Sequence, residues 1–306
     1  MPDRVISRGA LVALGVVAAL LLMVGSGESD PRTPVPPLEE PVRVEQDGAA
    51  KPKPPERAKP KPKECLERKR VAEARRWAAD RAGEISFAVL DECGRLVGDH
   101  RYRTHYSASV VKVMLLVAYL RLEGVSDDEL TGDEKAMLGP MITMSDNNAA
   151  NQVFAIVGEA GLYDVARDAG MGKFTTMPSW GGSEITAADQ AMFVGEIEHY
   201  VPKKHEDYVL ELMANVIDPQ RWGVPRMPLP GWMVHLKGGW APQASGGGWR
   251  VNQVALLRRH DRRLTVAILT SDNPDFEYGR GSIEGVAKRL LRAYKTKRPP
   301  SARFGN

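Results

Sequence analysis

The chain has 306 residues, of which 43% are hydrophobic and 26% are charged, as in an ordinary globular protein that can bury a sizeable core. Its net charge is only +3, and much of the basic surplus lies in two runs, at residues 51–63 and 295–298. Nucleic-acid binding is not expected, because it needs basic residues gathered on one folded face. The six histidines do not cluster, so we expect no metal site and no cofactor.

Residues 1–27 have the pattern of a signal peptide or a membrane anchor. Arg4 and Arg8 precede an uncharged, mostly apolar stretch at residues 9–27, which is long enough to cross a membrane. The sequence leaves open whether this segment is cleaved or retained. In either case the arginines place the rest of the chain outside the cytoplasm, secreted or held to the membrane by this segment alone.

Three further parts follow the N-terminal segment. Residues 28–64 are rich in proline and lysine, which is typical of an extended linker. Residues 65–297 are interpreted as one folded domain, expected to be a monomer. Residues 298–306 are interpreted as a flexible tail.

The first half of the folded domain combines a helix, a hairpin and a helical region. A helix is predicted at residues 65–82, and strands at 84–91 and 95–99 form the hairpin. Residues 110–122 are apolar on nearly every side, which predicts a helix that is buried all round. Helical patterns then continue to residue 213.

The second half contributes three strands and a closing helix, at residues 233–237, 253–258, 264–270 and 283–294. Strands from both ends of the domain must therefore share one sheet, with the helical middle inserted as a second lobe. Clefts between such lobes are favoured sites for ligands.

Cys65 and Cys93 are the only cysteines of the chain. The predicted helix of about 18 residues spans roughly 27 Å, and the strand that runs back spans about the same length, roughly 26 Å. Because a short turn joins them, their far ends should meet, and we expect a Cys65–Cys93 disulfide. Two free thiols are the alternative.

Ser109 and Lys112 form the first candidate motif, Ser-x-x-Lys. Residues three apart share a helix face, so Lys112 should lie within reach of the Ser109 hydroxyl. A buried lysine with a lowered pKa can accept the proton of a serine nucleophile. Taken alone, the pair is equally consistent with a helix-capping serine beside an ordinary lysine.

Ser145-Asp146-Asn147 forms the second candidate motif, expected between a helix and a loop. The Ser145 hydroxyl could relay a proton to a leaving group, and the Asn147 amide could bind a substrate carbonyl or hold Lys112. The same tripeptide recurs at residues 271–273. That copy follows a strand and precedes a proline, so we interpret it as a turn.

Lys237-Gly238-Gly239 forms the third candidate motif, expected at the end of a strand. Lys237 would attract an anionic group of the substrate, and the glycines would let a ligand approach the backbone. The N–H of Trp240 could form an oxyanion hole with that of Ser109. His235 alternates with Lys237 along the strand and could face the same side, and we interpret it as a packed or surface histidine.

The three motifs in this order resemble the set that marks class A β-lactamases and penicillin-binding proteins, Ser-x-x-Lys, Ser-Asp-Asn and Lys-Thr-Gly. The strings ITMSDNNAANQVF (residues 142–154) and ITAADQAMF (residues 185–193) are also similar to class A sequences. The resemblance covers residues 65–294. It implies an α/β (α+β) fold, with a five-stranded antiparallel sheet flanked by helices and an all-helical lobe.

The resemblance also implies roles for single residues. Ser109 would be the nucleophile and Lys112 its base or proton relay. Ser145 would shuttle a proton, Asn147 would contact the substrate, and Lys237 would anchor a carboxylate. The substrate would be a β-lactam or a D-alanyl peptide.

Three departures from the family pattern bear on function. Gly238 replaces the usual threonine or serine, and the stretch from Ser109 to Ser145 is short. The glutamate that activates the deacylating water has no counterpart, because the only acid between Gly170 and Thr186 is Glu184, which lies too close to Thr186. Slow deacylation is therefore expected.

Three functions remain open from the sequence. The first is a β-lactamase-like hydrolase that forms an acyl-enzyme with β-lactams. The second is a D-alanyl-D-alanine peptidase or transpeptidase acting on peptidoglycan, which the missing glutamate favours. The third is a non-catalytic wall-binding module, against which the intact serines and lysines argue.

Overall fold

The computed structural model describes residues 65–177, 179–243 and 246–294. The predicted N-terminal segment, the linker and the C-terminal tail lie outside the described residues. Within the part of the chain that is described, no helix is both long and apolar enough to cross a membrane.

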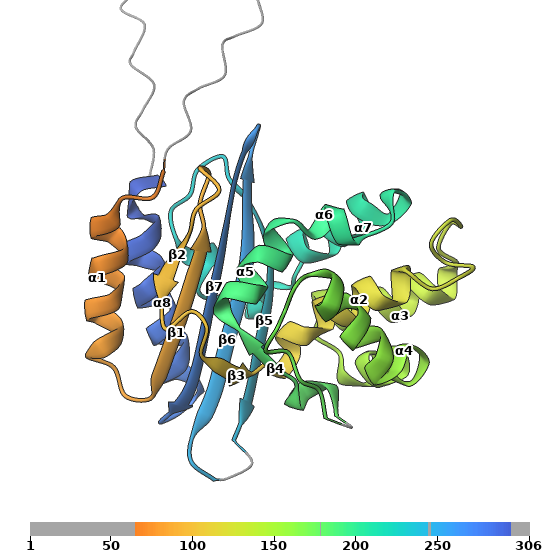
Figure 1. Ribbon diagram of the computed structural model, residues 1–306, viewed down its shortest axis with the longest axis horizontal. Helices are drawn as coiled ribbons and strands as arrows, with labels where there is room; N and C mark the ends of the chain where they lie inside the picture. Colours follow the sequence, from red (N-terminus) through yellow and green to blue (C-terminus); the bar gives the residue numbers. More distant parts are fainter. Residues whose placement is uncertain (1–64, 178, 244–245, 295–306) are drawn as a thin grey trace, which may run out of the picture. The chain divides into compact units, whose positions relative to one another are not determined.

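A five-stranded antiparallel sheet forms the centre of the domain, in the order β2-β1-β7-β6-β5 (Figure 1). Its N-terminal strand β1 pairs with β7 from the C-terminal half, as predicted. The inner strands are buried almost continuously rather than at every second residue, because both faces of the sheet are covered. The strands are β1 (Glu84–Leu90), β2 (Leu96–Asp99), β5 (Met233–Pro242), β6 (Trp249–Arg259) and β7 (Arg262–Asn273).

Helices cover both faces of the sheet. On one face, α1 (Arg68–Ala79) and α8 (Phe276–Leu291) lie side by side (Figure 1). On the other face, α5 (Ala187–Gly195) packs against β1 and β7. Each face has its own cluster of buried apolar side chains, which fixes the orientation of the sheet between them.

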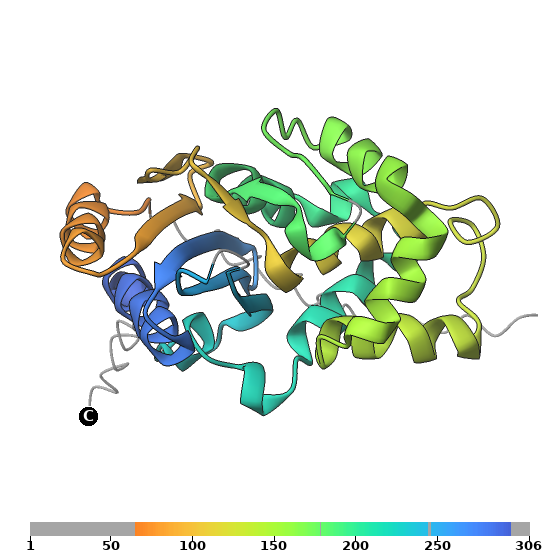
Figure 2. The same cartoon turned by 90° about the horizontal axis from the view of Figure 1, so that it is seen from below.

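The helical lobe consists of three helices that lie together beyond β5, in yellow and green (Figures 1 and 2). Every residue of α2 (Lys112–Leu120) is buried, as the apolar run predicts. The helices α3 (Gly132–Thr143) and α4 (Asn147–Asp168) pack against it. The predicted fold, a five-stranded antiparallel sheet with flanking helices and a helical lobe, is confirmed.

Short elements connect the sheet and the lobe. The strands β3 (Thr104–Tyr106) and β4 (Glu184–Thr186) form a second, two-stranded sheet that the sequence did not predict. It ties the chain before α2 to the chain before α5. The other short elements are α6 (Ile197–Tyr200), α7 (Glu206–Ala214) and the 3-10 turns η1 (Ala108–Val111), η2 (Trp180–Gly182), η3 (Lys203–His205), η4 (Asp218–Gln220), η5 (Val224–Arg226) and η6 (Arg292–Tyr294).

Several helix boundaries differ from the predicted ones, among them the starts of the first and the last helix. The first helix begins at Arg68 rather than at residue 65, because the disulfide and Asp91 hold the preceding segment. The last helix begins at Phe276 rather than at residue 283. Its N-cap is Asp275, whose side chain accepts a hydrogen bond of 2.7 Å from the N–H of Tyr278.

Several strand predictions were also wrong at their ends, and two of these differences bear on the candidate motifs. β5 continues to Pro242, so the Lys-Gly-Gly motif lies inside a strand and not at its end. Residues 271–273 are the last residues of β7 rather than a turn, since Asn273 still pairs with Trp249 of β6. In both places the neighbouring strand supplies hydrogen bonds that local turn signals cannot foresee.

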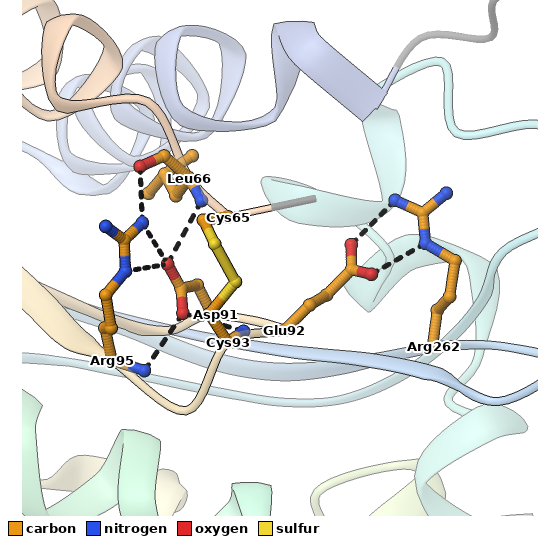
Figure 3. Close-up of a disulfide and its surroundings, with 7 residues drawn as sticks. All are labelled: Cys65, Leu66, Asp91, Glu92, Cys93, Arg95 and Arg262. Atoms are coloured by element: carbon orange, nitrogen blue, oxygen red, sulfur yellow. Dashed lines mark hydrogen bonds and ion pairs between the residues drawn. A yellow bond between two sulfur atoms is a disulfide. The ribbon is translucent and has the colours of Figure 1, made fainter. Parts of the chain in front are cut away.

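The predicted Cys65–Cys93 disulfide is present, with the two Cα atoms 5.3 Å apart (Figure 3). Asp91 fixes the same corner, because its carboxylate accepts hydrogen bonds from the backbone N–H of Leu66 and from the Arg95 guanidinium. Closing a loop with a sequence separation of 28 residues stabilises the domain by about 3–4 kcal/mol in the chain-entropy model.

Candidate active site

Ser109 lies in the 3-10 turn η1, which leads directly into α2. The residue before it, Ala108, has a φ of 46°, a left-handed conformation that is costly for any residue but glycine and is often found at functional sites. Ser109 is half-buried, whereas Ala108 and Val110 are buried. The turn therefore presents Ser109 as its accessible residue.

Lys112 is completely buried, and its ammonium turns toward the start of α4. Its Nζ donates to the backbone oxygens of Ser145 (2.6 Å) and Asp146 (3.1 Å). It also donates to Oδ1 of Asn147 at 2.8 Å. Ser109 and Lys112 lie one turn apart as predicted, but among the described hydrogen bonds Lys112 makes none with Ser109.

Ser145 connects the two lysines of the candidate motifs. Its Oγ is 2.9 Å from Nζ of Lys237 and 3.3 Å from Nζ of Lys112. Ser145 itself has a φ of 58°, in the connection between α3 and α4. The structure thus joins residues from α2, the α3–α4 connection and β5 in one hydrogen-bonded group.

Burial changes the protonation of both lysines. It lowers the pKa of Lys112 to about 8, although the Asp146 carboxylate opposes this change. Lys237 is also fully buried, and its pKa falls well below the usual value through burial and the positive charge of Lys112. Burial therefore makes the neutral amine form more accessible to these two lysines than to lysines on the surface.

Two glycines of β5 determine how closely the strand approaches η1. A Cβ atom on Gly239 would lie 2.7 Å from the backbone nitrogen of Ser109, so only glycine fits between β5 and the turn. A Cβ atom on Gly238 would lie 2.9 Å from the ring of Trp222. The hydroxyl residue usual at this position is excluded because Trp222 fills its space.

Two acidic residues, Glu184 and Asp189, lie near the start of α5. Glu184 accepts a hydrogen bond of 3.2 Å from Thr175 Oγ1. Asp189 lies in the first turn of α5, where burial raises the pKa of its carboxyl. Among the described residues, no carboxylate is hydrogen-bonded to or paired with Ser109, Lys112, Ser145 or Lys237.

The ring of Trp180 lies beside Lys112. Its ring centroid lies 4.7 Å from Nζ of Lys112, within the range of a cation–π contact. Its Nε1 donates a hydrogen bond of 2.8 Å to Oδ1 of Asn151 on α4. The sequence analysis missed both residues; Asn151 follows Asn147 by one helical turn, which was the available signal.

A cavity of about 1060 Å³ lies apart from these residues, lined in part by Leu210, Trp232 and His235. Its size alone would make it a candidate site. It contains none of the motif residues, however, and His235 is a packed histidine whose Nδ1 is 2.8 Å from the Leu210 carbonyl. The motif residues around Ser109, and not this cavity, therefore form the candidate active site.

The sequence matches the model of a known protein family. The model of the beta-lactamase enzyme family matches residues 135–294, more than half of the chain, and this range includes Ser145 and Lys237 but begins after Ser109. The sequence matches no protein of the curated set.

Solved structures share the fold at low sequence identity. A β-lactamase from Sphaerobacter thermophilus DSM 20745 is 19% identical, with a TM-score of 0.64 over 76% of this chain and 100% of its own. A class A β-lactamase from Mycobacterium abscessus is 19% identical, with a TM-score of 0.61 over 74% and 100%. The extended-spectrum β-lactamase TLA-1 is 15% identical, with a TM-score of 0.65 over 74% and 99%.

Proposed function

Because the chain belongs to the beta-lactamase enzyme family, and is thus a serine hydrolase of this type, we propose that Ser109 forms an acyl-enzyme with β-lactams. The observation that carries the proposal is Ser145 Oγ between the two buried lysines, at 3.3 Å and 2.9 Å. One such group can take a proton from a nucleophile and pass it to a leaving group. The nucleophile is Ser109, which is half-buried and lies in η1.

Acylation begins with attack of Ser109 Oγ on the lactam carbonyl. Neutral Lys112 accepts the serine proton, for which its lowered pKa of about 8 prepares it. The N–H groups of Ser109 and Trp240 stabilise the oxyanion, and the close approach of Gly239 to Ser109 supports this pairing.

Opening of the lactam ring requires a proton on its nitrogen. Ser145 Oγ gives that proton and regains one from a neighbouring lysine. Protonated Lys237 then faces the carboxylate of the substrate, whose charge favours the ammonium form, and Asn147 contacts a substrate carbonyl. No metal or cofactor takes part in this scheme.

A second candidate function is cleavage or transfer of D-alanyl peptides of peptidoglycan. The observation that favours it is the indole of Trp180 beside Lys112. An indole cannot act as the base for water that rapid hydrolysis of a β-lactam would need. Both functions use the same acylation step, and for both we propose a monomeric domain that acts outside the cytoplasm. The disulfide supports such a location, because disulfides persist in oxidising compartments.

Labelling with a fluorescent penicillin tests the proposal. The protein should carry the label on Ser109, identified by peptide mass, and Ser109→Ala should abolish it. Ser107→Ala is the matched control, because Ser107 is buried in the same segment. A wild-type protein that never labels, or a Ser109→Ala variant that labels equally, would refute the assignment.

A further inference from the structure

The indole of Trp180 covers one side of the proposed base. Lys112 is 0% exposed, and its three nitrogen-bound protons already have acceptors in Ser145, Asp146 and Asn147. The ring of Trp180, at 4.7 Å from Nζ, lies on a further side. Water is thereby kept from the nitrogen.

The ring is held in place from two directions. Trp180 Nε1 is bonded to Asn151 of α4, at 2.8 Å. The Trp180 carbonyl accepts hydrogen bonds from the N–H (3.1 Å) and Oγ (2.8 Å) of Ser183. The Ser183 carbonyl in turn accepts one of 2.7 Å from the N–H of Ser107, two residues before the nucleophile. Trp180 is therefore built into the site rather than loosely placed on its surface.

Hydrolysis of the acyl-enzyme needs a base for water, and the side of Lys112 that Trp180 covers does not provide one. Water must add its hydroxyl to the acyl carbon while the bond from that carbon to Ser109 Oγ breaks and Oγ regains a proton. A base has to hold that water and take its proton during attack. An indole has one N–H donor and no acceptor, and the donor of Trp180 is already used by Asn151.

We propose that Trp180 blocks deacylation, by occupying the place beside Lys112 where a base and its water would lie. This inference rests on the proposed acylation of Ser109. It assigns the long life of the acyl-enzyme to one residue that excludes water, and not only to the lack of a glutamate. An acceptor that enters from another side, such as an amine, is not subject to the same block.

Replacing the indole tests the proposal. Trp180→Glu puts a carboxylate beside Lys112 and should raise the deacylation rate by roughly tenfold or more, within the range that general bases contribute. Glutamine has the shape of glutamate without its charge. Trp180→Gln should therefore give a smaller increase in the deacylation rate, because it admits water but supplies no base. Deacylation is measured by intact mass after excess penicillin has been removed.

The pH dependence of the deacylation rate shows whether an increase comes from the new carboxylate or from a local change in structure around residue 180. The gain in Trp180→Glu should fall in acid as its carboxylate becomes protonated, whereas the gain in Trp180→Gln should not follow that titration. Met177→Glu is the matched control, because this substitution adds the same charge to the same segment at a side chain that is 59% exposed. It should deacylate like the wild type.

A further variant covers the case in which Trp180→Glu does not fold. Asn151→Ala removes the acceptor of the indole N–H from an exposed helix position, and it should speed deacylation by severalfold. If these variants acylate normally yet deacylate at the wild-type rate, the role of Trp180 is refuted while acylation of Ser109 stands. If no variant and no wild type ever acylates, the proposed function itself fails.

Discussion

The two sides of the candidate site differ in chemical character. On the side of β5 and the α3–α4 connection, Ser145 and two buried lysines form a polar group in which protons can move. On the side of η2, an indole faces the same Lys112. In the proposed mechanism, acylation and hydrolysis draw on different segments, so one fold can carry the groups for the first step without those for the second.

The largest expected effect concerns the polar side. Lys112→Ala removes the proposed base and should slow acylation of Ser109 by a factor of about 10²–10⁴, or roughly 3–5 kcal/mol of barrier. Stopped-flow measurement with a chromogenic β-lactam provides the rate. Lys135→Ala, on α3 and exposed, serves as the control. A Lys112→Ala variant that acylates at the wild-type rate would show that the polar side does not act as described.

The next prediction concerns the indole side in the wild-type protein. Without a base for water, deacylation should be slower by a factor of about 10²–10⁴, so that the acyl-serine accumulates with penicillins and lasts for minutes or longer. Intact-mass kinetics after mixing show whether the adduct builds up. Rapid turnover with no detectable adduct would mean that a base reaches the ester, and the contrast between the two sides would then be lost.

The pH dependence of acylation sharpens the role of Lys112. Its pKa is lowered to about 8, and only the neutral amine accepts the serine proton. The acylation rate should therefore rise with pH up to about 8 and fall about tenfold for each unit below it. Loss of charge on Lys237, whose pKa is also lowered, acts in the opposite direction, because only its ammonium form attracts the carboxylate of the substrate. A flat profile between pH 6 and pH 9 would exclude Lys112 as the base.

The smallest expected effect belongs to Asn147. Its Oδ1 accepts a hydrogen bond of 2.8 Å from Lys112, and the residue is exposed at the start of α4. Asn147→Ala should lower kcat/KM for acylation by about 10- to 150-fold, since one charge-assisted hydrogen bond contributes roughly 1.5–3 kcal/mol. It should also move the rising limb of the pH profile to lower pH, because the ammonium form loses an acceptor. An unchanged profile would show that Asn147 contacts the substrate alone.

Much of the fold could be predicted from the sequence. Periodic apolar residues predicted both hairpin strands, the buried helix after Ser109 and the C-terminal strands, since burial repeats with the geometry of each element. The spacing of Cys65 and Cys93 predicted their disulfide, because helix and strand lengths translate directly into distance. The boundaries of α1, α8 and β5 were wrong, since caps and neighbouring strands fix those ends.

The candidate site was likewise predicted only in part from the sequence. Ser109, Lys112, Ser145 and Lys237 could be named from three short motifs, because spacing along a helix or strand fixes which side chains share a face. Only the tertiary structure decided that Lys112 turns toward Ser145 and Asn147. It alone also placed Trp180 over the same ammonium, because that contact joins a turn and a helix far apart in the sequence, and no local periodicity encodes such a meeting.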